Sequence, residues 1–91
     1  MNVPDYDITA VEVTDHGVLE LTFADGTTGR VDDVLARLRG PVFERARTPE
    51  GFREAHIAEG TVAWPGGADL APDTLYERVR SGAWPVDVVA A

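Results

Sequence analysis

The sequence contains no cysteine, no lysine and a single serine, Ser81. Without cysteine there can be no disulfide, thiolate metal ligand or thiol nucleophile, and the composition suits a reducing compartment. Neither His16 nor His56 has a serine or a metal-ligand spacing near it, so a catalytic triad or a zinc site lacks its parts. Phosphate loops use a lysine that this chain does not contain. The sequence predicts no catalytic residue, no metal site and no cofactor.

Long hydrophobic runs are also missing, since no stretch approaches the roughly 18 apolar residues that span a bilayer. The first seven residues lack the basic and apolar regions of a signal peptide. We therefore expect a cytoplasmic protein without a membrane partner. A chain of 91 residues has room for one domain, 1–91, and its 44% hydrophobic and 26% charged residues are typical of a folded globular protein.

Positive charge is scarce, with eight arginines against sixteen acidic residues and a formal net charge of −8. A field of this sign repels phosphate backbones. The charge therefore predicts that the domain does not bind nucleic acid directly.

Residues 8–31 are predicted to form an antiparallel three-stranded meander. A three-residue turn at 15–17, with glycine in the left-handed position, pairs Val13 with Leu19 and Val11 with Leu21. All four side chains then lie on one face. Turn chemistry and hydrophobic pattern agree on this register.

The second turn of the meander, residues 24–26, has the same form. A three-residue loop pairs Leu21 with Gly29 and Leu19 with Val31, whereas a two-residue loop would place Val31 on the wrong face. It also pairs Phe23 with Thr27. The outer face of the sheet is expected to be solvated, and it carries Glu12, Glu20, Thr22 and Arg30.

The middle of the chain predicts short helices. The pair Asp32-Asp33 can cap a helix of about two turns that ends at Gly40-Pro41. Val42 and Phe43 are expected to be buried. Thr48 can cap one helical turn over residues 49–52, with proline in its first position. Its last residue, Phe52, is expected in the core.

A second antiparallel hairpin is predicted over residues 53–65, turning at Glu59-Gly60. A two-residue loop pairs Ile57 with Val62, and a three-residue loop pairs Ile57 with Thr61. The first packs better and the second avoids a positive φ at Glu59, so the register stays open.

The last predicted helix spans residues 72–81, with Gly82 ending it. The apolar tail, residues 83–89, can add an edge strand or dock on another chain. Its Trp84, Val86 and Val88 are candidate partner-binding residues. The fold class is α+β: a small single domain with a three-stranded meander, a second hairpin and short helices packed on one face.

Asp69 and Asp73 are the only paired carboxylates that attract a chemical interpretation. Carboxylates four residues apart can serve acid–base chemistry or hold a metal, with His56 as a further participant. Acids at the beginning of a helix also satisfy free N–H groups and complement the helix dipole. We favour this second, structural interpretation.

A set of residues across the chain resembles the bacterial family known as domain of unknown function 2442. The similarity begins with Phe-x-Asp-Gly, continues with a phenylalanine, and is most specific in Trp-Pro-x-Gly-x-Asp-Leu-x-Pro-Asp-x-Leu-Tyr. We call these the signature residues: Phe23, Asp25, Gly26, Phe52, Trp64, Pro65, Gly67, Asp69, Leu70, Pro72, Asp73, Leu75 and Tyr76. The resemblance covers residues 8–77 and leaves the helix end and tail, 78–91, outside it.

The resemblance implies a non-enzymatic role, because the family has no accepted catalytic residues. Its members resemble small cytoplasmic proteins, some encoded beside another small protein as in toxin–antitoxin pairs and some fused to a helix-turn-helix domain. It therefore implies an interaction module that binds another small protein or a second copy of itself, and the net negative charge favours a basic partner. Two alternatives stay open: a ligand-binding domain or enzyme that uses Asp69 and Asp73, and an accessory domain of a transcriptional regulator.

Overall fold

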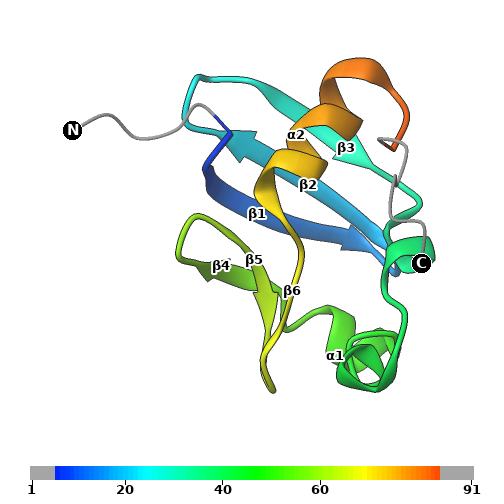
Figure 1. Ribbon diagram of the computed structural model, residues 1–91. Coiled ribbons are helices and arrows are strands. Elements are labelled where there is room, and N and C mark those ends of the chain that lie inside the picture. Colours follow the sequence, from blue (N-terminus) through cyan, green and yellow to red (C-terminus); the bar gives the residue numbers. More distant parts are fainter. Residues whose placement is uncertain (1–5, 85–91) are drawn as a thin grey trace, which may run out of the picture.

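The computed structural model describes residues 6–84, which form two antiparallel three-stranded sheets and short helices (Figure 1). The first sheet contains β1 (Ile8–Asp15), β2 (Val18–Phe23) and β3 (Thr28–Val31), in that order. Its pairs include Val13 with Leu19 and Leu19 with Val31, so the predicted meander and its register are confirmed.

The second sheet contains β4 (His56–Ala58), β5 (Thr61–Trp64) and β6 (Ala68–Asp69), also in that order. Ile57 pairs with Val62 across a two-residue turn, which decides the register that the sequence left open. In this turn Glu59 adopts a φ of +51° and Gly60 adopts a φ of +79°. The strand β6 was not predicted, and it lies between the predicted hairpin, 53–65, and the predicted helix, 72–81.

Two of the helices agree with the sequence analysis. The short helix α1 (Pro49–Phe52) begins with Thr48, whose side chain accepts a hydrogen bond from the Gly51 N–H. The helix α2 (Pro72–Ser81) ends at Gly82, which has a left-handed φ of +80°. Both helices carry proline in their first position, where a missing N–H has no consequence.

Two predictions for the middle of the chain were wrong. The expected two-turn helix is a single 3₁₀ turn, η1 (Val34–Arg37), and Asp33 makes no capping hydrogen bond because its carboxylate binds Arg78 and Trp84 instead. A second 3₁₀ turn, η2 (Pro41–Phe43), follows. It leaves Val42 50% exposed, since this turn directs Phe43 rather than Val42 toward the core.

One core joins the two sheets and α2. Phe52, Val62 and Leu75 have no exposed surface, and Trp64 is 3% exposed. α2 crosses one face of the first sheet (Figure 1), where Val79 lies directly over Gly29. A Cβ at Gly29 would be 2.3 Å from the Val79 Cγ1, so the close approach of helix and strand requires glycine.

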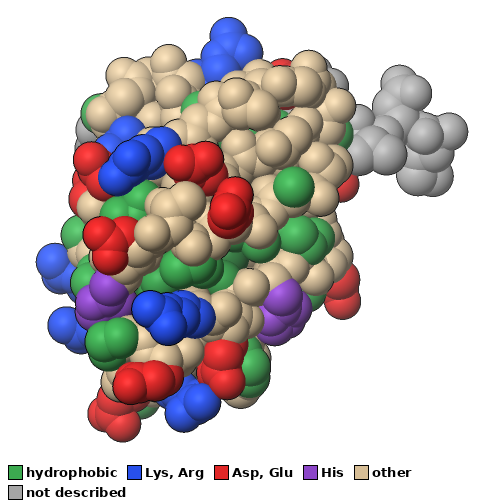
Figure 2. Space-filling model, turned by 180° about the vertical axis from the view of Figure 1, so that it is seen from behind, with side chains coloured by type: hydrophobic (Ala, Val, Ile, Leu, Met, Phe, Trp, Pro, Cys, Tyr) green, Lys and Arg blue, Asp and Glu red, His purple; other side chains and the backbone are tan. Residues whose placement is uncertain are grey.

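None of the described residues covers the other face of the first sheet, which is open to solvent. We call it the outer face, and it consists of Ala10, Glu12, Glu20, Thr22, Thr28 and Arg30. Thr22 is half-buried and the other five residues are exposed. Figure 2 views the molecule from this side, and acidic side chains lie near the middle of the face. In residues 6–84, no helix has the length and apolar character required to cross a bilayer.

Candidate functional site

Four signature residues hold the turn between β2 and β3 against α2. The rings of Phe23 and Tyr76 meet edge to face, with centroids 5.0 Å apart. The Tyr76 hydroxyl donates a hydrogen bond to the Asp25 carboxylate, and Arg80 donates to the Tyr76 oxygen at 3.0 Å. Gly26 supplies the positive φ of +90° that the turn needs. These residues therefore connect an early turn to the last helix.

The hydrogen bond from Tyr76 lowers the pKa of Asp25 below its ordinary value, and hydrogen bonds from Thr27 lower it further. A carboxylate that accepts several hydrogen bonds is stabilised in its charged form. Asp25 is therefore an acceptor that fixes the turn, and its depressed pKa makes it a poor general base at neutral pH.

A second group of signature residues builds the second sheet. The Trp64 Nε1 donates to the Phe52 carbonyl oxygen at 3.0 Å, and the two rings are 5.8 Å apart. The Leu70 N–H donates to the Val62 carbonyl oxygen at 3.1 Å, and the Thr61 hydroxyl donates to the Leu70 carbonyl oxygen. Every partner in this group is backbone or a buried ring, which is the pattern of a structural core.

The remaining signature residues turn the chain and start α2. Pro65 and Gly67 lie in the exposed turn between β5 and β6, and Gly67 has a φ of +91°. Pro72 is the first residue of α2, and Leu75 is its fully buried residue. Asp73 accepts a hydrogen bond from the Thr74 N–H in the first turn, where a negative charge complements the helix dipole.

The carboxylates singled out by their spacing do not form a pair in the structure. Asp69 belongs to β6 and Asp73 to α2, and both are exposed. Asp69 and His56 flank Ala63 on the two neighbouring strands and border a shallow hollow of about 490 Å³, which Asp73 does not line. The His56 Nδ1 is hydrogen-bonded to the Glu54 carbonyl oxygen at 3.0 Å. No enclosed polar pocket joins the three side chains.

Trp84 packs against its own chain. Its Nε1 donates to the Asp33 carboxylate at 2.9 Å, and the Cζ atoms of Arg37 and Arg78 lie 4.9 and 5.6 Å from the ring centroid. Arg78 also donates to Asp33 at 3.1 Å. This cluster anchors the end of α2 to η1. The candidate partner-binding residues Val86 and Val88 lie outside the described residues, so the role predicted for the tail stays a prediction.

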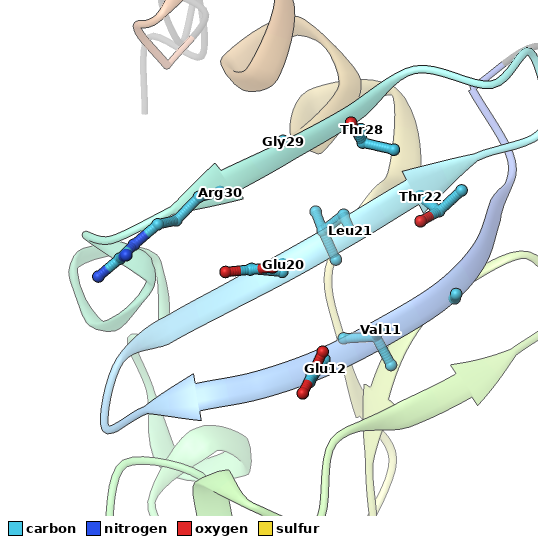
Figure 3. Close-up of a pocket in the computed structure, with 9 residues that line it drawn as sticks. Val11, Glu12, Glu20, Leu21, Thr22, Thr28, Gly29 and Arg30 are labelled. Atoms are coloured by element: carbon cyan, nitrogen blue, oxygen red, sulfur yellow. The ribbon is translucent and has the colours of Figure 1, made fainter.

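The outer face of the first sheet carries polar side chains that take no part in the core or in the contacts of Tyr76 and Trp84. Its residues border a shallow hollow of about 620 Å³. Glu12 and Glu20 project from directly opposite positions on β1 and β2 (Figure 3). Arg30 is the cross-strand neighbour of Glu20 on β3, but its side chain forms no ion pair among the described residues. The predicted register placed Glu12, Glu20, Thr22 and Arg30 on this face, but no motif in the sequence marked it as a site.

A family model described as protein of unknown function (DUF2442) matches residues 8–81. The match extends four residues beyond the region that the signature residues indicated, and it includes the whole of α2. The comparison with curated proteins and the comparison with solved structures found no match.

Proposed function

The chain belongs to the DUF2442 family, and we propose that it is a non-enzymatic protein-interaction module that binds a small basic protein, in the manner of an antitoxin or a regulatory partner. The observation that carries this proposal is the excess of negative charge that the fold leaves unneutralised. Two of the acidic residues, Glu12 and Glu20, lie opposite each other on the open outer face of the first sheet.

The internal ion pairs use few of the acidic residues. Fourteen of the sixteen lie in the described part of the chain, all but Asp5 and Asp87. Within that part, only Asp32, Asp33 and Glu54 are in ion pairs with arginine. The Glu54 pair has two short contacts, at 2.8 and 3.0 Å, and the hydrogen bond from arginine lowers the pKa of Glu54. Most carboxylates in residues 6–84 therefore form no ion pair with an arginine of that range.

Unneutralised charge favours a partner of opposite sign in two ways. It raises the association rate by electrostatic steering, and it disfavours partners with acidic surfaces. A basic protein of similar size would neutralise the repulsion among the carboxylates of this chain. Such neutralisation would stabilise an antitoxin-like or regulatory complex.

The test is purification of the tagged chain from its native cells at low ionic strength, with mass spectrometry for partners and light scattering for stoichiometry. We expect one basic protein of defined stoichiometry that dissociates as NaCl rises from about 0.05 M to about 0.5 M, because salt screens exposed charges. An untagged strain and a tagged acidic protein of unrelated fold are the controls. Recovery of the chain alone at low salt would contradict the proposal.

We also propose a cytoplasmic location, which the cysteine-free composition supports. Cell fractionation with an antibody against the native chain tests it. Recovery with the soluble cytoplasmic markers is the expected result, and recovery with the envelope fraction would contradict it.

A further inference from the structure

Glu12 and Glu20 occupy directly opposite positions on neighbouring antiparallel strands. Opposed residues of this kind have Cβ atoms about 4.5 to 5.5 Å apart, and two like charges there destabilise the sheet. Both side chains are exposed, so the core does not require either charge. A neutral residue at one of the two positions would give a more stable sheet.

The internal arginine nearest in register is not placed between the two carboxylates. Arg30 is the partner of Glu20 on β3, yet no ion pair joins them in the described part of the chain. In Figure 3 the Arg30 side chain extends along its own strand, away from Glu12. The space between the two carboxylates is therefore open to a cation from another molecule.

The side chains around the two carboxylates leave room for a planar group to approach the sheet. The neighbouring cross-strand row consists of Ala10, Thr22 and Thr28, whose side chains are short, and the hollow of about 620 Å³ spans both rows. A guanidinium can donate to two carboxylates at once through its planar fork, which an ammonium group cannot match. The threonine hydroxyls can accept or donate hydrogen bonds beside it.

We propose that the outer face of the first sheet is the docking surface for the basic partner, with an arginine of that partner between Glu12 and Glu20. The proposal rests on the proposed function and specifies its binding surface. Charge complementarity selects this occupant. A second copy of this chain would bring two further glutamates and one arginine to the same face, which leaves an excess of negative charge.

The experiment is an NMR titration of the ¹⁵N-labelled full chain with a short arginine-rich peptide, and in parallel with the same peptide in which citrulline replaces arginine. Citrulline has nearly the same shape and no charge. We expect shift changes concentrated at residues 10–12, 20–22 and 28–30 with the arginine peptide only.

Two variants of equal net charge make the test specific. Glu12→Gln/Glu20→Gln is expected to weaken peptide affinity about tenfold, because two charge-assisted hydrogen-bond acceptors are removed. Glu44→Gln/Glu77→Gln removes two exposed carboxylates elsewhere and is expected to change affinity less than about twofold. Urea unfolding of each variant establishes that it is folded.

Three outcomes would overturn the docking surface: shift changes spread over all acidic residues, equal weakening in both variants, or the same shift changes on raising protein concentration without peptide. The native partner separates this inference from the proposed function. If Glu12→Gln/Glu20→Gln retains that partner at the wild-type level, the surface is wrong and the proposed function stands. If the wild-type chain retrieves no basic protein, the proposed function fails.

Discussion

Trp64 connects three parts of the chain at the scale of a single residue. Its ring packs against Phe52 and Phe43, its Nε1 is hydrogen-bonded to the backbone before β4, and only 3% of the residue is exposed. Trp64→Ala would remove the ring contacts, remove one of the two hydrogen bonds to the Phe52 carbonyl oxygen and open a cavity. We expect a loss of about 3 to 5 kcal/mol in the free energy of unfolding.

Urea denaturation followed by circular dichroism measures this loss. A domain of this size has little stability to spare, so the variant is expected to be largely unfolded at 37 °C. Tyr6→Ala is the matched control, because Tyr6 is 40% exposed. A melting temperature of Trp64→Ala within a few degrees of the wild type would contradict the role of Trp64 as a core residue.

Replacing one of the opposed glutamates on the outer face is predicted to increase stability, whereas Trp64→Ala decreases it. Glu12→Gln removes the repulsion from Glu20 without changing side-chain size. We expect the free energy of unfolding to rise by about 0.2 to 1 kcal/mol, the range of cross-strand pair effects. Chemical denaturation at low salt measures it, with Glu44→Gln as control. A decrease in stability would mean that Glu12 makes a favourable contact with the fold.

Helix α2 and the first sheet approach each other at the scale of elements, and Gly29 is where they touch. Gly29→Ala places a methyl group 2.3 Å from the Val79 Cγ1, so helix and strand must separate. We expect a cost of about 1 to 3 kcal/mol, as for other overpacked cores. Adding Val79→Ala makes room, and the double variant should be more stable than the sum of the two changes predicts. Additive effects in this double-mutant cycle would contradict the contact.

The link between Asp25 and Tyr76 gives the same pair of elements a dependence on pH. The pKa of Asp25 is lowered in the folded chain, so the ionised carboxylate stabilises the fold above the unfolded pKa, near the ordinary 3.8. This contribution is lost as pH falls through the lower, folded pKa. Between about pH 6 and about pH 3, we expect the urea midpoint of Asp25→Asn to fall less than that of the wild type.

Tyr76→Phe is the companion variant, since it removes the hydrogen bond that contributes most to the lowered pKa. Its acid dependence should lie between those of the wild type and Asp25→Asn, because Thr27 still donates to the carboxylate. An unchanged acid profile in both variants would show that the turn and the helix are not coupled through this hydrogen bond.

Elements whose pattern fixes both turn and register could be predicted from the sequence. The meander followed from two glycine turns and alternating apolar residues, and α2 followed from Pro72 and Gly82. The strand β6 could not, because its two residues are too short to show a period. The exposure of Val42 depends on the direction of a 3₁₀ turn, which composition does not encode.

The site was harder to predict than the fold, for a reason that applies to the whole molecule. Sequence spacing singled out Asp69 and Asp73, which the fold places on different elements. The predicted register already opposed Glu12 and Glu20 on a solvated face, but no motif in the sequence indicated that this face is a site. Asp33 likewise had an evident local role as a cap, but a distant tryptophan and arginine recruit it. For Asp33, contacts made across the fold override the local preference.

The net charge of −8 predicts that salt acts in opposite directions on folding and on binding. Repulsion among carboxylates destabilises the isolated chain, and salt screens it. We expect the urea midpoint of the free protein to rise when NaCl increases from about 0.01 M to about 0.3 M. Over the same range, the complex with a basic partner should weaken, because salt also screens the attraction.

The Glu12→Gln/Glu20→Gln variant separates a local from a general origin of this salt effect. If the opposed pair dominates the repulsion, the midpoint of this variant should depend less on salt than that of Glu44→Gln/Glu77→Gln, although both variants carry the same net charge. Equal salt dependence in the two variants would assign the effect to the net charge as a whole. A wild-type midpoint that falls with salt would mean that attractive ion pairs outweigh the repulsion, contrary to the few pairs formed in residues 6–84.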